Sequence, residues 1–131
     1  MKEKYIFKVV QKAIIRLDDT YLILKRSPDS KSYPGYWDLA GGKLEHGEKF
    51  EKALIREVKE ETNLDIVVEE SIFIYVESKV ENSYAVLFNC EKRDGDIKLS
   101  DEHTEYKWVT KSEAQKLKLE PFLKDFFEKI D

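Results

Sequence analysis

The sequence has a single cysteine, Cys90, so a scaffold held together by disulfide bonds is excluded. It also lacks an apolar run of the roughly 18 residues that a membrane-spanning helix needs. Met1 to Val10 does not show the charged and then apolar pattern of a secretory leader. We therefore expect a soluble, cytoplasmic protein. Its 131 residues suit one domain, residues 1–131, because compact domains usually run to roughly 100–200 residues.

No excess of one charge sign dominates the chain, which has 27 acidic and 23 basic residues and a net charge of -4. The two signs are mixed along the sequence, which argues against a disordered charged tail and against a general nucleic-acid-binding surface. Nucleic acid is thus not expected as a partner, whereas a small molecule is. A monomer and a homodimer are both compatible with the sequence.

Apolar and β-branched runs separated by turn residues predict several strands. Residues 5–17 and 21–25 form the expected first hairpin, followed by a loop over residues 27–36. Residues 37–44 predict a strand that runs into a bend permitted by Gly41 and Gly42. Further strands are expected at residues 66–79, 84–92, 97–99 and 106–109.

Helical spacing first occurs between residues 49 and 62, where apolar residues recur every three or four positions. Gly47 is the expected N-cap of this helix, and Asn63 suits a left-handed residue after its last turn. Thr110 and Glu113 predict a capping box that opens a short helix through Leu117. The last helix is expected to begin at Pro121 and to bury a stripe of Phe122, Leu123, Phe126, Phe127 and Ile130. This order predicts an α+β fold with a mixed sheet covered by helices.

Three carboxylates, Glu57, Glu60 and Glu61, share one side of the first helix. Like charges at this spacing repel, each pair costing a few tenths of a kcal/mol, so helix stability alone does not favour them. A divalent cation would reverse that repulsion, and Mg²⁺, with Mn²⁺ as a second possibility, prefers carboxylate oxygens together with phosphate oxygens. The alternative interpretation is a solvated acidic face, which is the commoner origin of charge runs.

The spacing around these carboxylates resembles the Nudix box, and the chain is similar to MutT-like members of the Nudix hydrolase family. The box spans residues 42–64, and Asn63 replaces its last glycine while Ala40 stands where many members have proline. The resemblance implies the Nudix fold, a mixed sheet sandwiched between helices. The matching positions are Gly42, Glu48, Arg56, Glu57, Val58, Glu60, Glu61 and Leu64.

This resemblance implies Mg²⁺-dependent hydrolysis of a nucleoside diphosphate linked to another group. The expected metal ligands are Glu57, Glu60, Glu61 and the backbone carbonyl of Gly41, while Arg56 paired with Glu48 would orient the acidic cluster. The general base would come from the box, at Glu57, or from a later loop, at Glu102, with Glu105 as a competitor. Expected substrate-binding residues are Arg26, Asp38, Gly42 and Lys43.

The substrate expected first is a nucleoside triphosphate or its oxidised form, cleaved to the monophosphate and pyrophosphate. The alternatives are ADP-ribose or a nucleotide sugar, and, in another class, a nucleotide sensor that does not cleave its ligand. An RNA end-processing enzyme would need a basic groove, of which the acidic balance gives little sign. His46 and His103 are expected to be polar loop residues rather than ligands, and Cys90 to be a core residue rather than a nucleophile.

Overall fold

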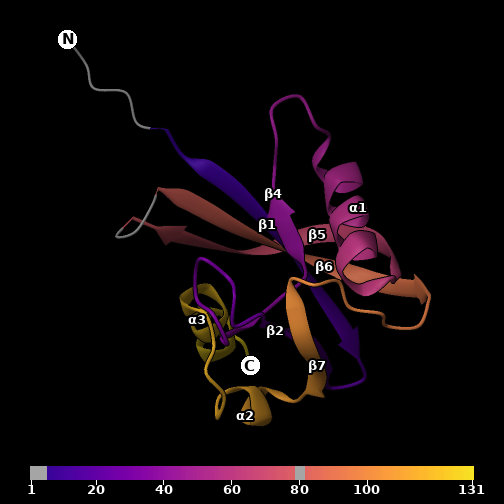
Figure 1. Cartoon of the computed structure of the whole chain (residues 1–131), viewed down its shortest axis with the longest axis vertical. Coiled ribbons are helices and arrows are strands. Elements are labelled where there is room, and N and C mark those ends of the chain that lie inside the picture. Colours follow the sequence, from indigo (N-terminus) through magenta and orange to yellow (C-terminus); the bar gives the residue numbers. More distant parts are fainter. Residues whose placement is uncertain (1–5, 79–81) are drawn as a thin grey trace.

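The computed structural model describes residues 6–78 and 82–131, and in this part of the chain seven strands form one mixed sheet (Figure 1). The strand order is β3-β2-β1-β6-β5, with β4 paired to β1 and β7 paired to β2. β1 and β6 run parallel, whereas every other pair is antiparallel, so the expected mixed sheet is confirmed. The strands are β1 (Lys8–Leu17), β2 (Thr20–Arg26), β3 (Trp37–Asp38), β4 (Gly41–Lys43), β5 (Asp65–Glu77), β6 (Ser83–Asp94) and β7 (His103–Val109).

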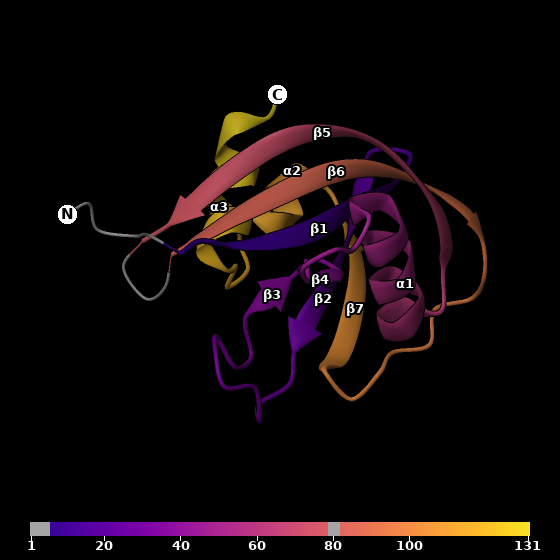
Figure 2. The ribbon, with the colours of Figure 1, turned by 90° about the horizontal axis from the view of Figure 1, so that it is seen from above.

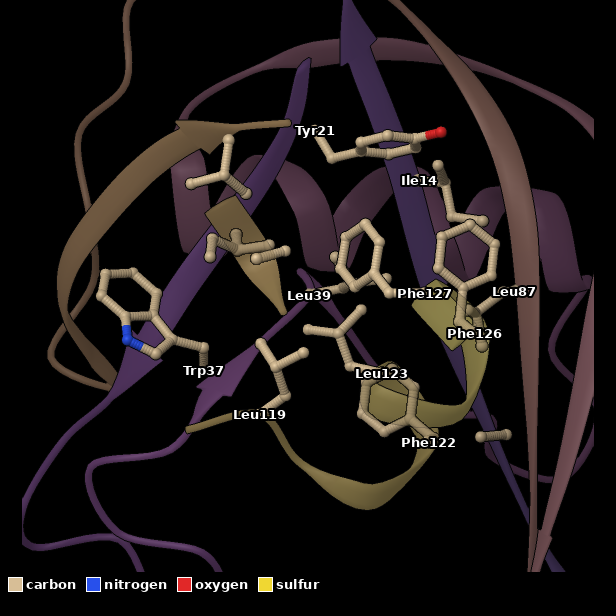
Figure 3. Close-up of a cluster of buried hydrophobic side chains, with 14 residues drawn as sticks. Ile14, Tyr21, Trp37, Leu39, Leu87, Leu119, Phe122, Leu123, Phe126 and Phe127 are labelled. Atoms are coloured by element: carbon tan, nitrogen blue, oxygen red, sulfur yellow. The ribbon is translucent and has the colours of Figure 1, made fainter. Parts of the chain in front are cut away.

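Helices cover both faces of this sheet, as the α+β interpretation predicts. α1 (Phe50–Thr62) lies on one side of β1, and α2 (Lys111–Ala114) and α3 (Pro121–Lys129) lie on the other (Figure 2). Successive residues of β1 point in opposite directions. Ile14 therefore packs with α3, in the cluster drawn in Figure 3, while Ala13 and Ile15 pack with α1. The α3 side of the core holds Phe122, Leu123, Phe126 and Phe127, as the apolar stripe predicts.

The first hairpin forms as expected, with Arg16 opposite Tyr21 and a turn in which Asp18 adopts a left-handed φ of 56°. The strand expected over residues 5–17 begins at Tyr5, and the strand expected over residues 66–79 ends at Lys79. These two end residues lie outside the described part of the chain. Cys90 is buried in the α1 side of the core, and burial raises the pKa of its thiol to about 12, which agrees with a core residue. In the described part of the chain, no helix is long and apolar enough to cross a membrane.

The expected strand over residues 37–44 is wrong as a single element. β3 pairs with β2, β4 pairs with β1, and Leu39 and Ala40 carry the chain from one neighbour to the other. The Ala40 carbonyl accepts a hydrogen bond from the Ala13 N–H at 2.8 Å, so the crossing is held against β1. Gly41 sits directly after this crossing and brings the chain onto the edge of β1.

The expected strand at residues 97–99 is also wrong, because these residues are irregular. Their backbone groups serve the end of α1 instead, where the last carbonyls of a helix lack partners within the helix. The Lys98 N–H donates to the Thr62 carbonyl at 2.9 Å, and the Ser100 N–H donates to the Glu61 carbonyl at 3.3 Å. The segment is thus the cap of α1 rather than part of the sheet.

The helix ends agree with the sequence except at two points. Asn63 adopts the left-handed conformation with φ of 68°, and the Thr110–Glu113 capping box is formed. The N-cap of α1 is Lys49 rather than Gly47, because Gly47 lies in the preceding turn with φ of 81°. α2 ends at Ala114, and only single turns continue to Leu117. Pro121 opens α3 as predicted.

Candidate active site

A cavity of about 450 Å³ opens where β2, β3, β4, α1 and the start of β7 meet. It has an acidic wall and a basic wall, which is the combination that a metal-bound phosphate ester needs. The residues that line it are Lys12, Arg26, Ser27, Asp29, Ser30, Asp38, Gly41, Gly42, Glu61, Asp101, Glu102 and His103. Six of the residues expected from the sequence are therefore brought together: Arg26, Asp38, Gly41, Gly42, Glu61 and Glu102.

The basic wall is built around Asp38, whose side chain is 1% exposed. One of its oxygens contacts both Lys12 Nζ and Arg26 Nη1 at 3.0 Å. Burial alone would raise the pKa of Asp38, but Lys12, His103, Glu120 and Arg26 hold it well below its usual range. Asp38 therefore stays ionised and positions the two cations rather than presenting itself to solvent.

Lys12 is a functional candidate that the sequence did not reveal. Burial alone would lower its pKa, but Asp38 above all, with Glu120 and Glu61, raises it, so the ammonium group stays charged. The only signal in the sequence was a lysine in the middle of a mostly apolar strand. Arg26 was expected, and its guanidinium also donates to Ser30 Oγ and to the Ser32 carbonyl, which fixes the loop after β2.

The acidic wall consists of Glu61, Glu102 and His103, whose nearest ligand atoms all lie within 4.8 Å of one another. Glu61 accepts a hydrogen bond from the Gly41 N–H at 3.3 Å and is 4% exposed. Burial, then repulsion from Glu102 and Asp38, raises the pKa of Glu61 to about 8, although Lys12 opposes this shift. A buried carboxyl of this kind favours binding of a cation, which would replace the proton.

The three helix carboxylates do not share one environment. The Glu57 carboxyl lies over Gly42, where an added Cβ would come within 2.6 Å of Glu57 Cδ, and burial raises the pKa of Glu57. Glu60 is 58% exposed and pairs with Arg56 at 3.3 Å. Only Glu61 points into the cavity wall. Glu57, Glu60 and the exposed Lys43 are outside the lining of the cavity, so the structure does not place these expected metal-binding and substrate-binding residues in it, although Glu57 lies against Gly42, which does line it.

Arg56 and Glu48 form the pair that the family resemblance implies. Arg56 Nη2 lies 3.0 Å from Glu48 Oε2, and Glu48 Oε1 accepts a hydrogen bond from the Glu45 N–H at 2.7 Å. Both contacts, not burial, lower the pKa of Glu48. Because Arg56 Nη1 also lies 3.3 Å from Glu57, this arginine links the turn before α1 to the helix carboxylates.

A second cavity of about 280 Å³ adjoins the first and shares Lys12 and Arg26 with it. Tyr33 and Tyr75 line it together with Glu120, which directly precedes α3. Glu120 is 8% exposed, and its Oε2 has no hydrogen-bond partner among the described residues. Burial, then repulsion from Asp38, raises the pKa of Glu120 to about 9. Nothing in the sequence pointed to this residue, which follows alternating lysines and leucines ahead of Pro121.

The shift at Glu120 predicts a pH-dependent effect of Glu120→Gln on stability. In the folded chain the Glu120 carboxyl keeps its proton up to about pH 9. In the unfolded chain, where its pKa is the ordinary 4.5, the same carboxyl loses its proton at a much lower pH. Wild-type stability should therefore fall, relative to the variant, as the pH rises from 5 to 8. Urea unfolding at both pH values should show the difference growing by on the order of 1–4 kcal/mol. An unchanged difference would contradict the shift.

A divalent cation fits the donor atoms of the acidic wall. Carboxylate oxygens from Glu61 and Glu102 are the ligands that hard cations prefer. His103 Nδ1 is buried there without a hydrogen-bond partner among the described residues. The sequence predicted that His103 is a polar loop residue, and this prediction is wrong. His103 is the first residue of β7 and is 6% exposed.

Comparisons with known proteins agree with this architecture. The family model described as the NUDIX domain matches residues 8–130. Nucleoside triphosphatase NudI of Escherichia coli O81 (strain ED1a) is 32% identical over 108 residues, which cover 73% of this chain and 77% of that relative.

Solved structures show the same similarity over nearly the whole chain. The crystal structure of the MutT protein from Methanosarcina mazei Go1 has a TM-score of 0.85 and 32% identity, covering 97% of this chain and 94% of the other. The solution structure of the Escherichia coli ORF135 protein has a TM-score of 0.77 and 28% identity, covering 95% and 88%.

Proposed function

Because this chain belongs to the NUDIX domain family, we propose that it is a metal-dependent pyrophosphohydrolase of nucleoside triphosphates, acting as a single catalytic domain. Water would cleave the anhydride bond between the α- and β-phosphates, giving a nucleoside monophosphate and pyrophosphate. The observation that carries this proposal is the cavity in which the acidic wall, Glu61 and Glu102, faces Lys12 and Arg26.

The residues proposed to hold the cation are Glu57, Glu60, Glu61 and the carbonyl of Gly41, and Glu102 adds a further carboxylate. Mg²⁺ is the ion expected from the oxygen-rich donor set, with Mn²⁺ as the alternative. When bound, such a cation neutralises phosphate charge and lowers the pKa of a bound water. The exposed position of Glu60, paired with Arg56, makes it the weakest of these assignments.

The other residues of the cavity bind and orient. Lys12 and Arg26, held by Asp38, supply fixed positive charge to the polyphosphate, while the backbone at Gly42 allows close approach of the substrate because it has no side chain. Glu57 or Glu102 would accept the proton of the attacking water. Arg56 and Glu48 would keep Glu57 in place through the 3.0 Å and 3.3 Å contacts described above.

The nucleoside triphosphate substrate is supported by two features. NudI, at 32% identity, is named a nucleoside triphosphatase. The second cavity adjoins the phosphate-binding one and has Tyr33 and Tyr75 in its wall, and aromatic rings suit a planar base. ADP-ribose and nucleotide sugars are the second candidates, because they present the same diphosphate to the same residues.

Product analysis on a panel of substrates tests this proposal. Nucleoside triphosphates, oxidised triphosphates, ADP-ribose and nucleotide sugars would each be incubated with Mg²⁺, with Mn²⁺ and with chelator. We expect metal-dependent release of pyrophosphate from triphosphates. Faster release of ribose phosphate from ADP-ribose would favour the second candidate. Tight nucleotide binding without any product would replace the enzyme with a nucleotide sensor.

A further inference from the structure

His103 occupies an unusual position for a histidine in a folded core. It begins β7, opposite Arg26 of β2, and only 6% of it is exposed. Its Nδ1 atom has no hydrogen-bond partner in the described part of the chain and lies 4.0 Å from Glu61 Oε1. A buried polar atom without a partner costs free energy, commonly about 1–3 kcal/mol. Something absent from the polypeptide is therefore expected at Nδ1.

The other ring nitrogen faces a carboxylate that is held in its ionised form. His103 Nε2 lies 3.9 Å from Asp38 Oδ2, and that same oxygen contacts Lys12 and Arg26. An ionised carboxylate on this side favours the tautomer whose proton is on Nε2. The lone pair is then on Nδ1, which faces Glu61 Oε1 at 4.0 Å. Histidines that bind metals usually face a carboxylate or a carbonyl with their other ring nitrogen.

The three groups at this point form a compact donor set. One carboxylate oxygen each from Glu61 and Glu102 and one ring nitrogen of His103 lie within 4.8 Å of one another. They come from different elements, since Glu61 is in α1, Glu102 directly precedes β7 and His103 is the first residue of β7. The set therefore assembles only in the fold, which is why the sequence did not indicate His103 as a ligand.

We propose that His103 Nδ1 joins Glu61 and Glu102 as a ligand of the divalent cation, and that this nitrogen makes the position selective for Mn²⁺ over Mg²⁺. Imidazole is a good ligand for transition-metal ions, whereas Mg²⁺ favours oxygen. The inference rests on the proposed function only for the presence of a cation in this cavity. It goes beyond that function by naming a nitrogen ligand, which places Mn²⁺ ahead of Mg²⁺, the ion that the oxygen ligands taken alone favour.

Pulsed EPR of Mn²⁺ bound to protein labelled with ¹⁵N-histidine tests the ligand directly. The chain has two histidines, and His46 is exposed in the turn before α1, so His46→Gln is the matched control. We expect hyperfine coupling from a coordinated ¹⁵N in the wild type and in His46→Gln, and its loss in His103→Gln. No coupling in the wild type, or coupling that persists in His103→Gln, would overturn the proposal.

Metal titration without nucleotide measures the selectivity. The wild type should bind Mn²⁺ at least about tenfold more tightly than Mg²⁺, and His103→Gln should weaken Mn²⁺ binding about tenfold or more while changing Mg²⁺ binding less than about threefold. Equal affinities of the wild type for the two ions would contradict the proposal. The wild-type spectrum and affinities do not depend on the folding of any variant. Hydrolysis of nucleotides without ¹⁵N coupling would refute this inference and leave the proposed function standing, whereas coupling without hydrolysis would do the reverse.

Discussion

Glu61→Gln and Glu57→Gln are each expected to lower kcat by about 100-fold or more, because each removes a carboxylate proposed to hold the cation. Neither should unfold the protein. Glutamine at residue 61 has nearly the same shape, keeps an oxygen for the Gly41 N–H and carries no charge into a buried site. Glutamine at residue 57 loses a contact with the half-exposed Arg56, which contributes little to stability.

Steady-state kinetics with saturating Mg²⁺ or Mn²⁺, beside urea unfolding, separates the two effects. Glu51→Gln is the matched control, since Glu51 is an exposed glutamate in the first turn of the same helix, outside the cavity lining. The control should keep kcat within about twofold, and all three variants should unfold within about 1 kcal/mol of the wild type. Wild-type turnover in both Glu61→Gln and Glu57→Gln would refute the site assignment.

Gly41→Ala is expected to destabilise the fold by about 3 kcal/mol or more, a size that follows only from strong local disruption. The new Cβ would lie 1.9 Å from the Gln11 carbonyl oxygen, within the paired backbone of β1 and β4. Neither strand can move away without breaking this pairing. Gly41 also has a backbone φ of 155°, which residues with a side chain rarely adopt. Thermal unfolding and urea unfolding measure the loss.

The neighbouring Gly42→Ala gives the contrasting result. The three heavy atoms nearest to its Cβ would all belong to the Glu57 carboxyl, the flexible end of a side chain, at 2.6–3.0 Å. The fold should survive, but the displaced Glu57 should lower kcat by about tenfold or more, because small misplacements of reacting groups are costly. A Gly41→Ala variant as stable as the wild type would show that β4 does not approach β1 as closely as the structure has it.

Local signals in the sequence predicted the elements that depend on neighbouring residues. The spacing of apolar residues predicted α1, the left-handed Asn63 ended it, and Thr110 with Glu113 opened α2. The box carboxylates and the Arg56–Glu48 pair followed from the resemblance to a family, and the structure has that pair at 3.0 Å.

Features that depend on distant parts of the chain escaped prediction. The parallel pairing of β1 with β6 joins segments more than 70 residues apart, and no local pattern specifies it. Lys12 lies in this paired part of β1, and its ammonium group contacts Asp38 of β3. His103 was expected in a loop because its burial arises from the pairing of β7 with β2. Residues whose environment comes from three elements at once cannot be assigned from periodicity.

The irregular segment that caps α1 also sets the number of residues between the end of this helix and the start of β7. At one end the Ser100 N–H is bonded to the Glu61 carbonyl, and two residues later the Glu102 carbonyl accepts a hydrogen bond from the Ser27 N–H of the loop after β2. Asp101 is the one residue between these two bonded residues, so the segment cannot take up an extra residue without moving one of the bonds. Ile97 and Leu99 of the segment pack against the α1 side of the core, and an inserted or deleted residue would shift Glu102 and His103 out of step with Glu61. The length of this segment is therefore a requirement of the site.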